Sequence, residues 1–219
     1  MTILFRKNPG DRVLELGGGS NPDSISDVNI DIRPCADAQG NPTVHFIADF
    51  EKPFTAEHNQ AIADNDFDGV IAKFSLEHVS WTRLPDLLRE VLRIIKPGGR
   101  ACFVLPDTES QMKWIQTHPE GWDGKGVFEA ASELLFGTQS YTENTHKVYL
   151  SPSIMCQLLQ EAGFGSNILV QPYNDRGTDM VIECGKPWEK CGVIGPQGVV
   201  CILPRGHIRD HKGELGYVE

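Results

Sequence analysis

Two histidines have side chains suited to acid–base chemistry. His78 lies in the segment LEHV, shortly after an apolar run, and His146 lies in the segment ENTHK, at the end of a long polar stretch. Imidazole changes its protonation near neutral pH, which makes it the commonest general base. We expect both to be catalytic residues facing one pocket, with Tyr141 and Glu143 beside His146. Two alternatives stay open: His78 only hydrogen-bonds a loop carbonyl, and Tyr141 and Glu143 belong to a solvated loop.

A glycine-rich loop follows the first apolar run, in the segment VLELGGGS. Gly17, Gly18 and Gly19 have no side chains, so their backbone N–H groups can approach a ligand above the edge of a parallel sheet. This loop alone indicates a nucleotide-like ligand or a tight corner, because dinucleotide-binding enzymes use the same arrangement.

The charges near this loop distinguish two classes of cofactor. A dinucleotide carries an anionic pyrophosphate, whereas S-adenosylmethionine carries an ammonium group, a carboxylate and a sulfonium. Glu15 precedes the glycines and suits a cation, and Pro22 with Asp23 stands where a phosphate-binding helix would begin. The regular G-x-G-x-x-G spacing is missing as well. The loop therefore favours S-adenosylmethionine over a nicotinamide dinucleotide.

Carboxylates and aromatic rings follow the next three apolar runs. Asp31, with Ile32 beside it, closes the second run, where a carboxylate can accept hydrogen bonds from both ribose hydroxyls. Asp49 and Phe50 follow the third run and suit the amino group and the face of an adenine. Phe74 follows the fourth run and either covers the other face of that ring or is an ordinary core residue.

Apolar runs alternate with helical patterns along the chain, which is typical of an α/β protein with a mostly parallel sheet. We predict seven strands, over residues 12–16, 28–32, 44–48, 67–73, 100–105, 167–171 and 179–184. We predict helices over residues 82–95, 109–117, 127–136 and 152–162. The segment KPGG at 96–99 should end the first helix and turn the chain into the fifth strand. The predicted fold is a doubly wound, seven-stranded α/β sheet.

A long insertion, 107–150, separates the fifth strand from the last helix. Connections of this length are usually functional, so we expect a lid over an acceptor pocket. Trp114, Trp122 and Phe128 should form a small core of the insertion, with stacking against an acceptor as the alternative.

Length and composition predict one globular domain with a tail. The 219 residues include 20 Lys and Arg against 30 Asp and Glu, a net charge of -10, which disfavours a nucleic-acid partner. Residues 1–12 lack the apolar stretch of a signal peptide, and no apolar run reaches the length of a membrane span. We therefore expect a cytoplasmic protein without membrane insertion, with its six scattered cysteines reduced.

The main domain is predicted over residues 1–185, followed by a hairpin or docking tail over 186–219, where glycine and proline become frequent. The apolar segment 199–203, or an edge strand, could pair two chains, so a homodimer stays open. The tail also offers potential zinc ligands, namely Cys191, Cys201, His207 and His211. The separation of its cysteines does not fit a zinc knuckle, so we predict no metal site.

Five segments carry a family resemblance: VLELGGGSNP, NIDIRP, IADFEKPF, FDGVIAKFSLEHVSW and EVLRIIKPGGRACFVLPD. In this order they resemble the motifs of class I (Rossmann-like) S-adenosylmethionine-dependent methyltransferases, of the type 11 kind. With the later stretch LLFGTQSYTENTHKVYLSPSIMCQLLQEAGF, the similarity extends over residues 11–185. It is strongest to a group of predicted bacterial methyltransferases associated with cell-surface polysaccharide genes.

The resemblance implies a site for S-adenosylmethionine built from residues that follow the first four strands. These are Glu15, Gly17 and Gly19 for the methionine part, Asp31 for the ribose, Asp49 and Phe50 for the adenine, and Lys73 and Phe74 for the methionyl end. Two departures from the family stand out. The step from Gly19 to Asp31 is too short for a full helix, so we expect a loop or a single turn and a more exposed cofactor. The chain begins almost at its first strand, so the insertion would have to cap the acceptor pocket.

These observations predict an enzyme that transfers a methyl group from S-adenosylmethionine to a small-molecule or sugar acceptor, at oxygen, and releases S-adenosylhomocysteine. Two alternatives stay open. The first is a non-catalytic protein that binds the cofactor and docks to a partner through the insertion or the tail. The second is an NAD-dependent oxidoreductase.

Overall fold

The computed structural model describes residues 6–55, 61–122, 124–165 and 167–188, and the backbone of two short strands, β8 (Val200–Cys201) and β9 (Tyr217–Val218). The chain divides into two compact units, Met1–Lys186 and Pro187–Glu219. In the second unit, β8 pairs antiparallel with β9. The potential zinc ligands of the tail lie outside the described residues, apart from the backbone of Cys201. The division into a catalytic domain and a docking tail stays a prediction.

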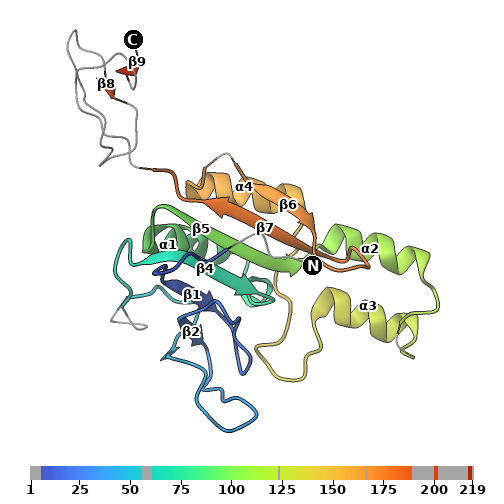
Figure 1. Cartoon of the computed structure of the whole chain (residues 1–219). Helices are drawn as coiled ribbons and strands as arrows, with labels where there is room; N and C mark the ends of the chain where they lie inside the picture. The colour runs from blue at the N-terminus through green and yellow to red at the C-terminus, as the bar shows by residue number, and fades with distance from the viewer. Residues whose placement is uncertain are drawn as a thin grey trace. The chain divides into compact units, whose positions relative to one another are not determined.

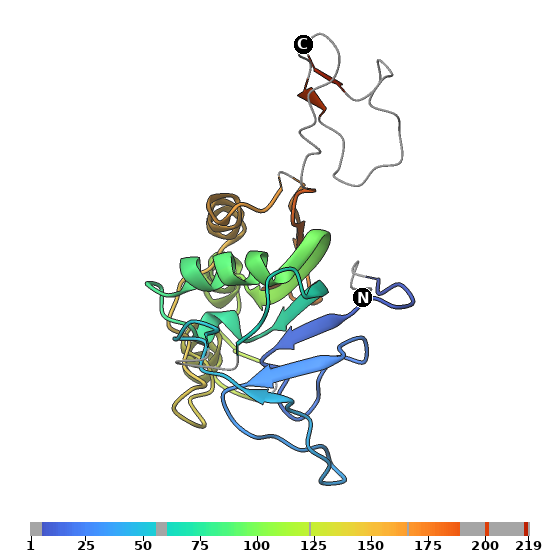
Figure 2. The same cartoon turned by 90° about the vertical axis from the view of Figure 1, so that its left-hand side faces the viewer.

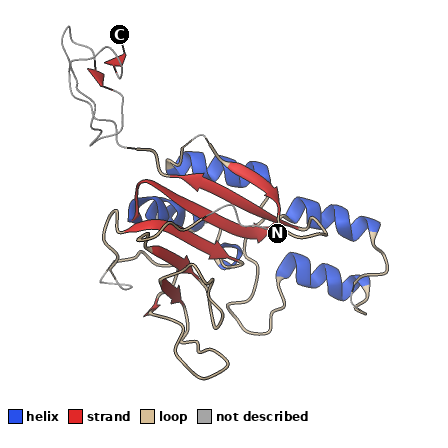
Figure 3. Cartoon of the chain, viewed as in Figure 1, coloured by secondary structure: helices blue, strands red, loops and turns tan. Residues whose placement is uncertain are grey.

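A seven-stranded sheet forms the first unit (Figure 1, Figure 3). Its strands are β1 (Val13–Leu16), β2 (Val28–Asp31), β3 (Phe46–Ile47), β4 (Phe67–Lys73), β5 (Ile95–Pro106), β6 (Leu169–Pro172) and β7 (Asp179–Gly185). Their order is β3-β2-β1-β4-β5-β7-β6. Neighbours from β3 to β5 are parallel, whereas β7 is antiparallel to both β5 and β6. The predicted seven-stranded, mostly parallel α/β fold is confirmed.

Two helices, α1 (Leu84–Ile94) and α4 (Pro152–Ala162), contact each other and cover one face of the sheet (Figure 2). The apolar stripe of α1 is buried, as its helical spacing predicts. The Ser151 side chain caps the start of α4, and Gly163 ends this helix in the left-handed conformation. None of the helices in the described ranges has the length and apolarity needed to cross a membrane.

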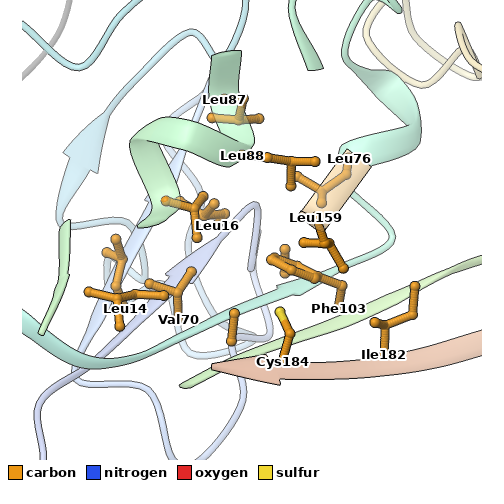
Figure 4. Close-up of a cluster of buried hydrophobic side chains, with 14 of the residues drawn as sticks. Leu14, Leu16, Val70, Leu76, Leu87, Leu88, Phe103, Leu159, Ile182 and Cys184 are labelled. Carbon is orange, nitrogen blue, oxygen red and sulfur yellow. The ribbon is translucent and has the colours of Figure 1, made fainter. Parts of the chain in front are cut away.

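The main core lies between the sheet and these helices (Figure 4). It includes Leu14, Leu16 and Val70 of the central strands, Leu87 and Leu88 of α1, and Leu159 of α4, all fully buried.

A smaller apolar cluster lies on the opposite face of the sheet, built on Val13, Ile71 and Val104, and Ile25 packs against it. Ile25 comes from the β1–β2 crossover, residues 17–27, which contains no helix and lies wholly within the described chain. The predicted loop between Gly19 and Asp31 is therefore confirmed. Strand geometry alternates side chains between faces, which puts Val13 and Leu14 in different clusters.

The insertion contains α2 (Thr108–Thr117) and α3 (Val127–Phe136), which contact each other beyond the carboxyl end of β5 (Figure 1). Asp107 caps α2 through the backbone N–H of Ser110. A 3-10 turn, η1 (Leu76–His78), follows β4 on the same side.

The start of β5 differs from the prediction that 96–99 is a turn. Here β5 begins at Ile95, and its register against β4 jumps from the pair Phe67–Ile95 to the pair Gly69–Arg100. The intervening residues bulge out and hydrogen-bond instead to Lys186, through Gly98 N and Gly99 O. A backbone partner distant in sequence, Lys186, therefore extends the strand, which local turn signals could not indicate.

Candidate active site

A cavity of about 410 Å³ lies where β1, β2, β3 and β4 end. Its walls combine the glycine loop, the ends of these strands and the insertion, and include Gly17, Gly19, Asp31, Ile32, Asp49, Phe50, Phe74, His78, Tyr141, Glu143 and Lys147. The carboxyl edge of a parallel sheet is the usual ligand site in such folds. The volume is in the range of cofactor pockets.

Two positions of the glycine loop, Gly17 and Gly18, leave no room for a side chain. A Cβ on Gly17 would lie 2.6 Å from Ser75 Cβ, and the residue has a φ of 77°, in the left-handed region. A Cβ on Gly18 would lie 2.7 Å from Asn29 Oδ1, which accepts the Gly18 N–H at 3.0 Å. Gly17 and Gly19 line the cavity, so the loop forms a backbone cradle of the kind that a nucleotide-like cofactor requires.

Asp31, the last residue of β2, is fixed by two backbone groups. Its Oδ2 accepts the Gly19 N–H at 3.1 Å, and its Oδ1 accepts the Arg33 N–H at 3.2 Å. The carboxylate keeps further lone pairs for hydroxyl donors. Ile32 beside it is 38% exposed and contributes apolar surface to the same cavity.

Asp49 and Phe50 also line the cavity, after the neighbouring strand β3. Asp49 Oδ1 accepts the Glu51 N–H at 3.0 Å, and Lys52 Nζ lies 3.3 Å from Asp49 Oδ2. The Phe50 ring packs edge-on against Phe54, with 6.1 Å between ring centroids. A carboxylate and a ring held by Phe54 thus line the cavity side by side in the chain.

Phe74 has an unusual backbone. Its φ is 49°, which is uncommon for a bulky residue, and its N–H donates to Val104 O at 2.9 Å. The ring contacts Tyr173 edge-on and stays 43% exposed. This conformation keeps the ring in the cavity wall rather than in the core, where sequence alone would often put a phenylalanine.

Three predicted cofactor residues, Glu15, Gly18 and Lys73, are not among the described residues that line the cavity. Glu15 is 2% exposed, and its Oε2 accepts the Asp23 N–H at 2.6 Å. Burial raises the pKa of Glu15 above its ordinary value. Lys73 forms an ion pair with Asp23. These residues brace the segment behind the glycines, and their predicted contact with the cofactor stays a prediction.

The end of the insertion closes over the cavity. The Arg33 guanidinium lies 3.8 Å from the centroid of the Tyr141 ring, a cation–π contact between the β2 end and the insertion. Lys147 Nζ lies 2.9 Å from Glu51 Oε1. The Lys147 N–H also donates to Glu77 O at 2.8 Å. The insertion is therefore tied to the loops after β2, β3 and β4.

A second cavity, of about 350 Å³, lies between the insertion, the end of β5 and the start of β7. Phe74, His78 and Tyr141 line both cavities, so the two share a wall. Its other walls are mainly polar and include Trp122, Glu133, His146, Asn174, Arg176 and Asp179.

The aromatic residues of the insertion have different environments. Trp114 stacks on His118, with 4.2 Å between centroids, and contacts Trp122 at 5.0 Å. Arg176 lies over the Trp122 ring at 4.7 Å. Phe128 is 82% exposed, so the prediction that it belongs to the core of the insertion is wrong. It lies at the start of α3, on a side of this helix that does not pack against α2.

His78 and His146 lie together, as the sequence predicts, with 5.3 Å between ring centroids. His78 Nδ1 lies 3.1 Å from Thr145 O, so the alternative of a hydrogen bond to a loop carbonyl also applies. Burial lowers the pKa of His78, and burial together with the neighbouring His78 lowers the pKa of His146 to about 4. Both rings are therefore neutral at neutral pH and can accept a proton or bind a cation.

Glu77 was not expected among the functional residues. It is 2% exposed, and burial raises its pKa to about 8. It lines the second cavity with both histidines. Charged residues are usually solvated, and the only sequence signal was an acidic residue among the apolar ones of SLEHV. Arg33, Glu51 and Lys147 were also missed, although each follows closely after a predicted site residue.

The strand order with its antiparallel β7, and the glycine-lined cavity at the carboxyl edge, define a class I methyltransferase fold. Residues 1–166 match the family described as methyltransferase domain, which is more than half of the chain. The chain belongs to this family. It is an S-adenosylmethionine-dependent methyltransferase, with S-adenosylmethionine as its cofactor.

Known proteins similar to this chain agree with the assignment. The 2-phytyl-1,4-naphtoquinone methyltransferase of Thermosynechococcus vestitus is 30% identical over 105 residues, which are 47% of this chain and 44% of that protein. The match therefore spans less than half of this relative. A SAM-dependent methyltransferase from Thermotoga maritima has a TM-score of 0.53 at 19% identity, over 84% of both chains. One from Mesorhizobium loti has a TM-score of 0.53 at 17% identity, over 81% of this chain and 91% of that chain. At these identities the solved structures show the fold alone.

Proposed function

We propose that this protein methylates a hydroxyl oxygen of a small polar acceptor of the saccharide class, bound in the second cavity. The observation that carries the proposal is the wall common to the two cavities, formed by Phe74, His78 and Tyr141. Methyl transfer requires the donor and the acceptor to lie in contact and in line. Adjoining cavities with a shared wall suit this requirement.

The first cavity is assigned to the cofactor. The backbone of Gly17 and Gly19 would hold the methionine part, and Asp31 would accept hydrogen bonds from the ribose hydroxyls. Asp49 and Phe50 would hold the adenine. When bound, S-adenosylmethionine supplies an electrophilic methyl group. The protein's task is then to orient the acceptor and to remove its proton.

His78 and His146 are the proposed proton acceptors. Their lowered pKa values leave both rings unprotonated at neutral pH, so a ring nitrogen can take the hydroxyl proton. Both line the second cavity, and His78 also lines the first. Of the two histidines, His78 is therefore the one that lines both the proposed donor site and the proposed acceptor site.

The lining of the second cavity supports a saccharide. Carboxylates and amides such as Glu133, Asp179 and Asn174 match the alternating donors and acceptors of a polyol. Trp122 offers a ring face for the C–H side of a sugar. An apolar acceptor would take these half-buried polar groups out of water without offering them hydrogen bonds, at a cost in binding.

Labelled methyl transfer tests the proposal. Purified protein would be incubated with S-adenosylmethionine carrying a labelled methyl group, together with monosaccharides, nucleotide sugars and a fractionated small-molecule extract. We expect a base-stable methyl ether on a sugar, since a methyl ester would be cleaved by base. His78→Gln and His146→Gln should each lower kcat by about a hundredfold. His118→Gln, outside both cavities, should not.

Trp122→Ala should raise the acceptor KM and leave the affinity for S-adenosylhomocysteine unchanged, with the exposed Trp81→Ala as its control. Transfer to nitrogen or carbon would contradict the choice of atom. Retained S-adenosylhomocysteine binding without transfer to any acceptor would instead favour a non-catalytic binding protein. Association with surface-polysaccharide synthesis, a cytoplasmic location and a homodimer stay predictions of the sequence.

A further inference from the structure

We propose that Glu77, His78 and His146 form a binding site for one divalent transition-metal ion, of which zinc best matches the ligand types. Each side chain offers one ligand atom, and these atoms lie within 4.8 Å of one another. Glu77 and His78 come from the turn η1, whereas His146 comes from the end of the insertion. The insertion therefore completes the site by bringing in its third ligand.

The Glu77 carboxyl group is a second, independent observation. It is 2% exposed, and within the described part of the chain its Oε2 has no hydrogen-bond partner. A buried polar atom without a partner is costly and is rarely retained without a reason. Asp179 adds a negative field at the same place. A cation between Glu77 and the two rings would give this oxygen its missing partner.

The orientation of His78 matches that of a metal ligand. A carbonyl oxygen can only accept, so His78 Nδ1, 3.1 Å from Thr145 O, must carry the proton and donate. Nε2 then keeps a lone pair for an ion. Metal-ligating histidines commonly donate their other N–H to a backbone carbonyl in this way. The His146 ring lies near the backbone of Leu134 and Leu135, towards the end of α3.

Two imidazoles and one carboxylate form the ligand set of many catalytic zinc sites, which leave one position open. Ligands of a tetrahedral ion lie roughly 3.3 Å apart, so small side-chain rotations would close the present separation around the ion. All three residues line the second cavity, so the open position faces the acceptor.

An acceptor hydroxyl could bind at the open coordination position of the ion. That step rests on the proposed function, whereas metal binding itself does not. An ion there would lower the pKa of a bound hydroxyl. It would occupy the lone pairs of His78 and His146 that otherwise accept the proton, so the bound hydroxyl would release its proton to water instead.

Metal titration of the full, tag-free chain after chelator treatment tests the site. Zn²⁺ binding would be measured by calorimetry and Co²⁺ binding by absorption, for the wild type and for Glu77→Gln and His146→Gln. We expect one ion per chain at the triad. Removal of a group that only supports a metal ligand lowers metal affinity by roughly tenfold to hundredfold. Because Glu77 and His146 would bind the ion directly, both variants should lose more metal affinity than this. Glu109→Gln and His118→Gln, on and just after α2, are the matched controls and should bind like the wild type.

Ions held by the tail cysteines would be recognised by a sulfur-to-cobalt charge-transfer band, which the triad cannot produce. S-adenosylhomocysteine binding, measured on the same samples, reports whether each variant is folded. Binding of no ion by the wild type, or binding that Glu77→Gln and His146→Gln leave unchanged in correctly folded protein, would overturn the proposal. Metal binding that persists without any methyl transfer would support the site and contradict the proposed function.

Discussion

Lys147 Nζ lies 2.9 Å from Glu51 Oε1, and this ion pair joins the end of the insertion to the loop after β3. The Glu51 carboxylate also accepts the backbone N–H and the hydroxyl of Ser80, at 2.8 and 2.6 Å. Burial alone would raise the pKa of Glu51, but the bonds from Ser80 and Lys147 outweigh it and hold this pKa below its usual value. Because Glu51 and Lys147 both line the first cavity, their ion pair closes one of its walls.

Lys147→Met should weaken S-adenosylhomocysteine binding by about fivefold or less, because both partners are at least a third exposed and solvent screens such pairs. The wild type should lose part of its affinity in high salt, and the variant should lose less. Calorimetry at low and high ionic strength measures both effects. Lys113→Met removes an exposed i,i+4 pair on α2 and should change neither. Equal salt dependence in wild type and Lys147→Met would show that the pair does not close the cavity.

Gly17→Ala should reduce S-adenosylhomocysteine binding by about tenfold or more and destabilise the fold by about 1–3 kcal/mol. The added Cβ would lie 2.6 Å from Ser75 Cβ, at a φ of 77°. Gly10→Ala is the matched control, because Gly10 has a φ of 89° and open space around it. It carries the backbone strain without the clash. If Gly17→Ala and Gly10→Ala lose similar cofactor affinity, backbone strain causes the loss, and the close approach of the Gly17 backbone to the cofactor does not.

Asp31→Asn should weaken S-adenosylhomocysteine binding by about tenfold, since a neutral amide replaces a charged acceptor for the ribose hydroxyls. The fold should lose about 0.5–1.5 kcal/mol, because the single amide oxygen can accept only one of the two N–H groups, of Gly19 and Arg33, that the carboxylate accepts. An analogue lacking both ribose hydroxyls should bind the two proteins alike. Asp86→Asn, exposed on α1, serves as the control. If Asp31→Asn still binds S-adenosylhomocysteine more tightly than the analogue, to the same degree as the wild type, the ribose does not bind at Asp31.

The fold was largely predictable from sequence because its signals are local. The stripe of α1, the cap at Ser151 and the burial of β4 each follow from residues within a few positions of one another. The extension of β5 was not predictable, since it depends on hydrogen bonds to Lys186. A β3 of only two paired residues likewise reflects the edge of the sheet, where one neighbour is missing.

The site residues whose positions follow from backbone geometry were predictable from the sequence. Those whose properties depend on burial were not. Gly17, Asp31 and Phe74 lie at the ends of parallel strands, so their convergence follows from topology. Glu77 is different, because segments distant in sequence surround it, among them the insertion and the start of β7, and no local pattern reports that cover. Glu15 was assigned to the cofactor by its charge, whereas strand alternation turns it to the face opposite Leu14 and Leu16.

The ion pair of Lys73 with Asp23 makes a prediction for stability against pH. Burial alone would raise the pKa of Asp23, but the hydrogen bond and charge of Lys73 and the Ile25 N–H outweigh it, so this pKa is lowered in the folded state. A lowered folded pKa contributes stability above the unfolded pKa, about 3.9, and this stability is lost as the pH falls through the folded value. The free energy of unfolding should therefore drop as the wild type is acidified below about pH 5.

Lys73→Met should reverse the sign of the Asp23 contribution. Without the lysine, burial dominates and raises the pKa of Asp23, so its contribution is present at low pH and lost as the pH rises. Urea unfolding between pH 3.5 and 6, at on the order of four pH values per protein, would measure the free energy of unfolding. Asp23→Asn and the double variant complete a double-mutant cycle, in which the contributions of the other carboxylates cancel. Parallel pH profiles for the wild type and Lys73→Met would mean that the pair does not hold the segment behind the glycine loop. If the profiles diverge and cofactor affinity falls with them, Lys73 acts on the site through Asp23 rather than by touching the ligand.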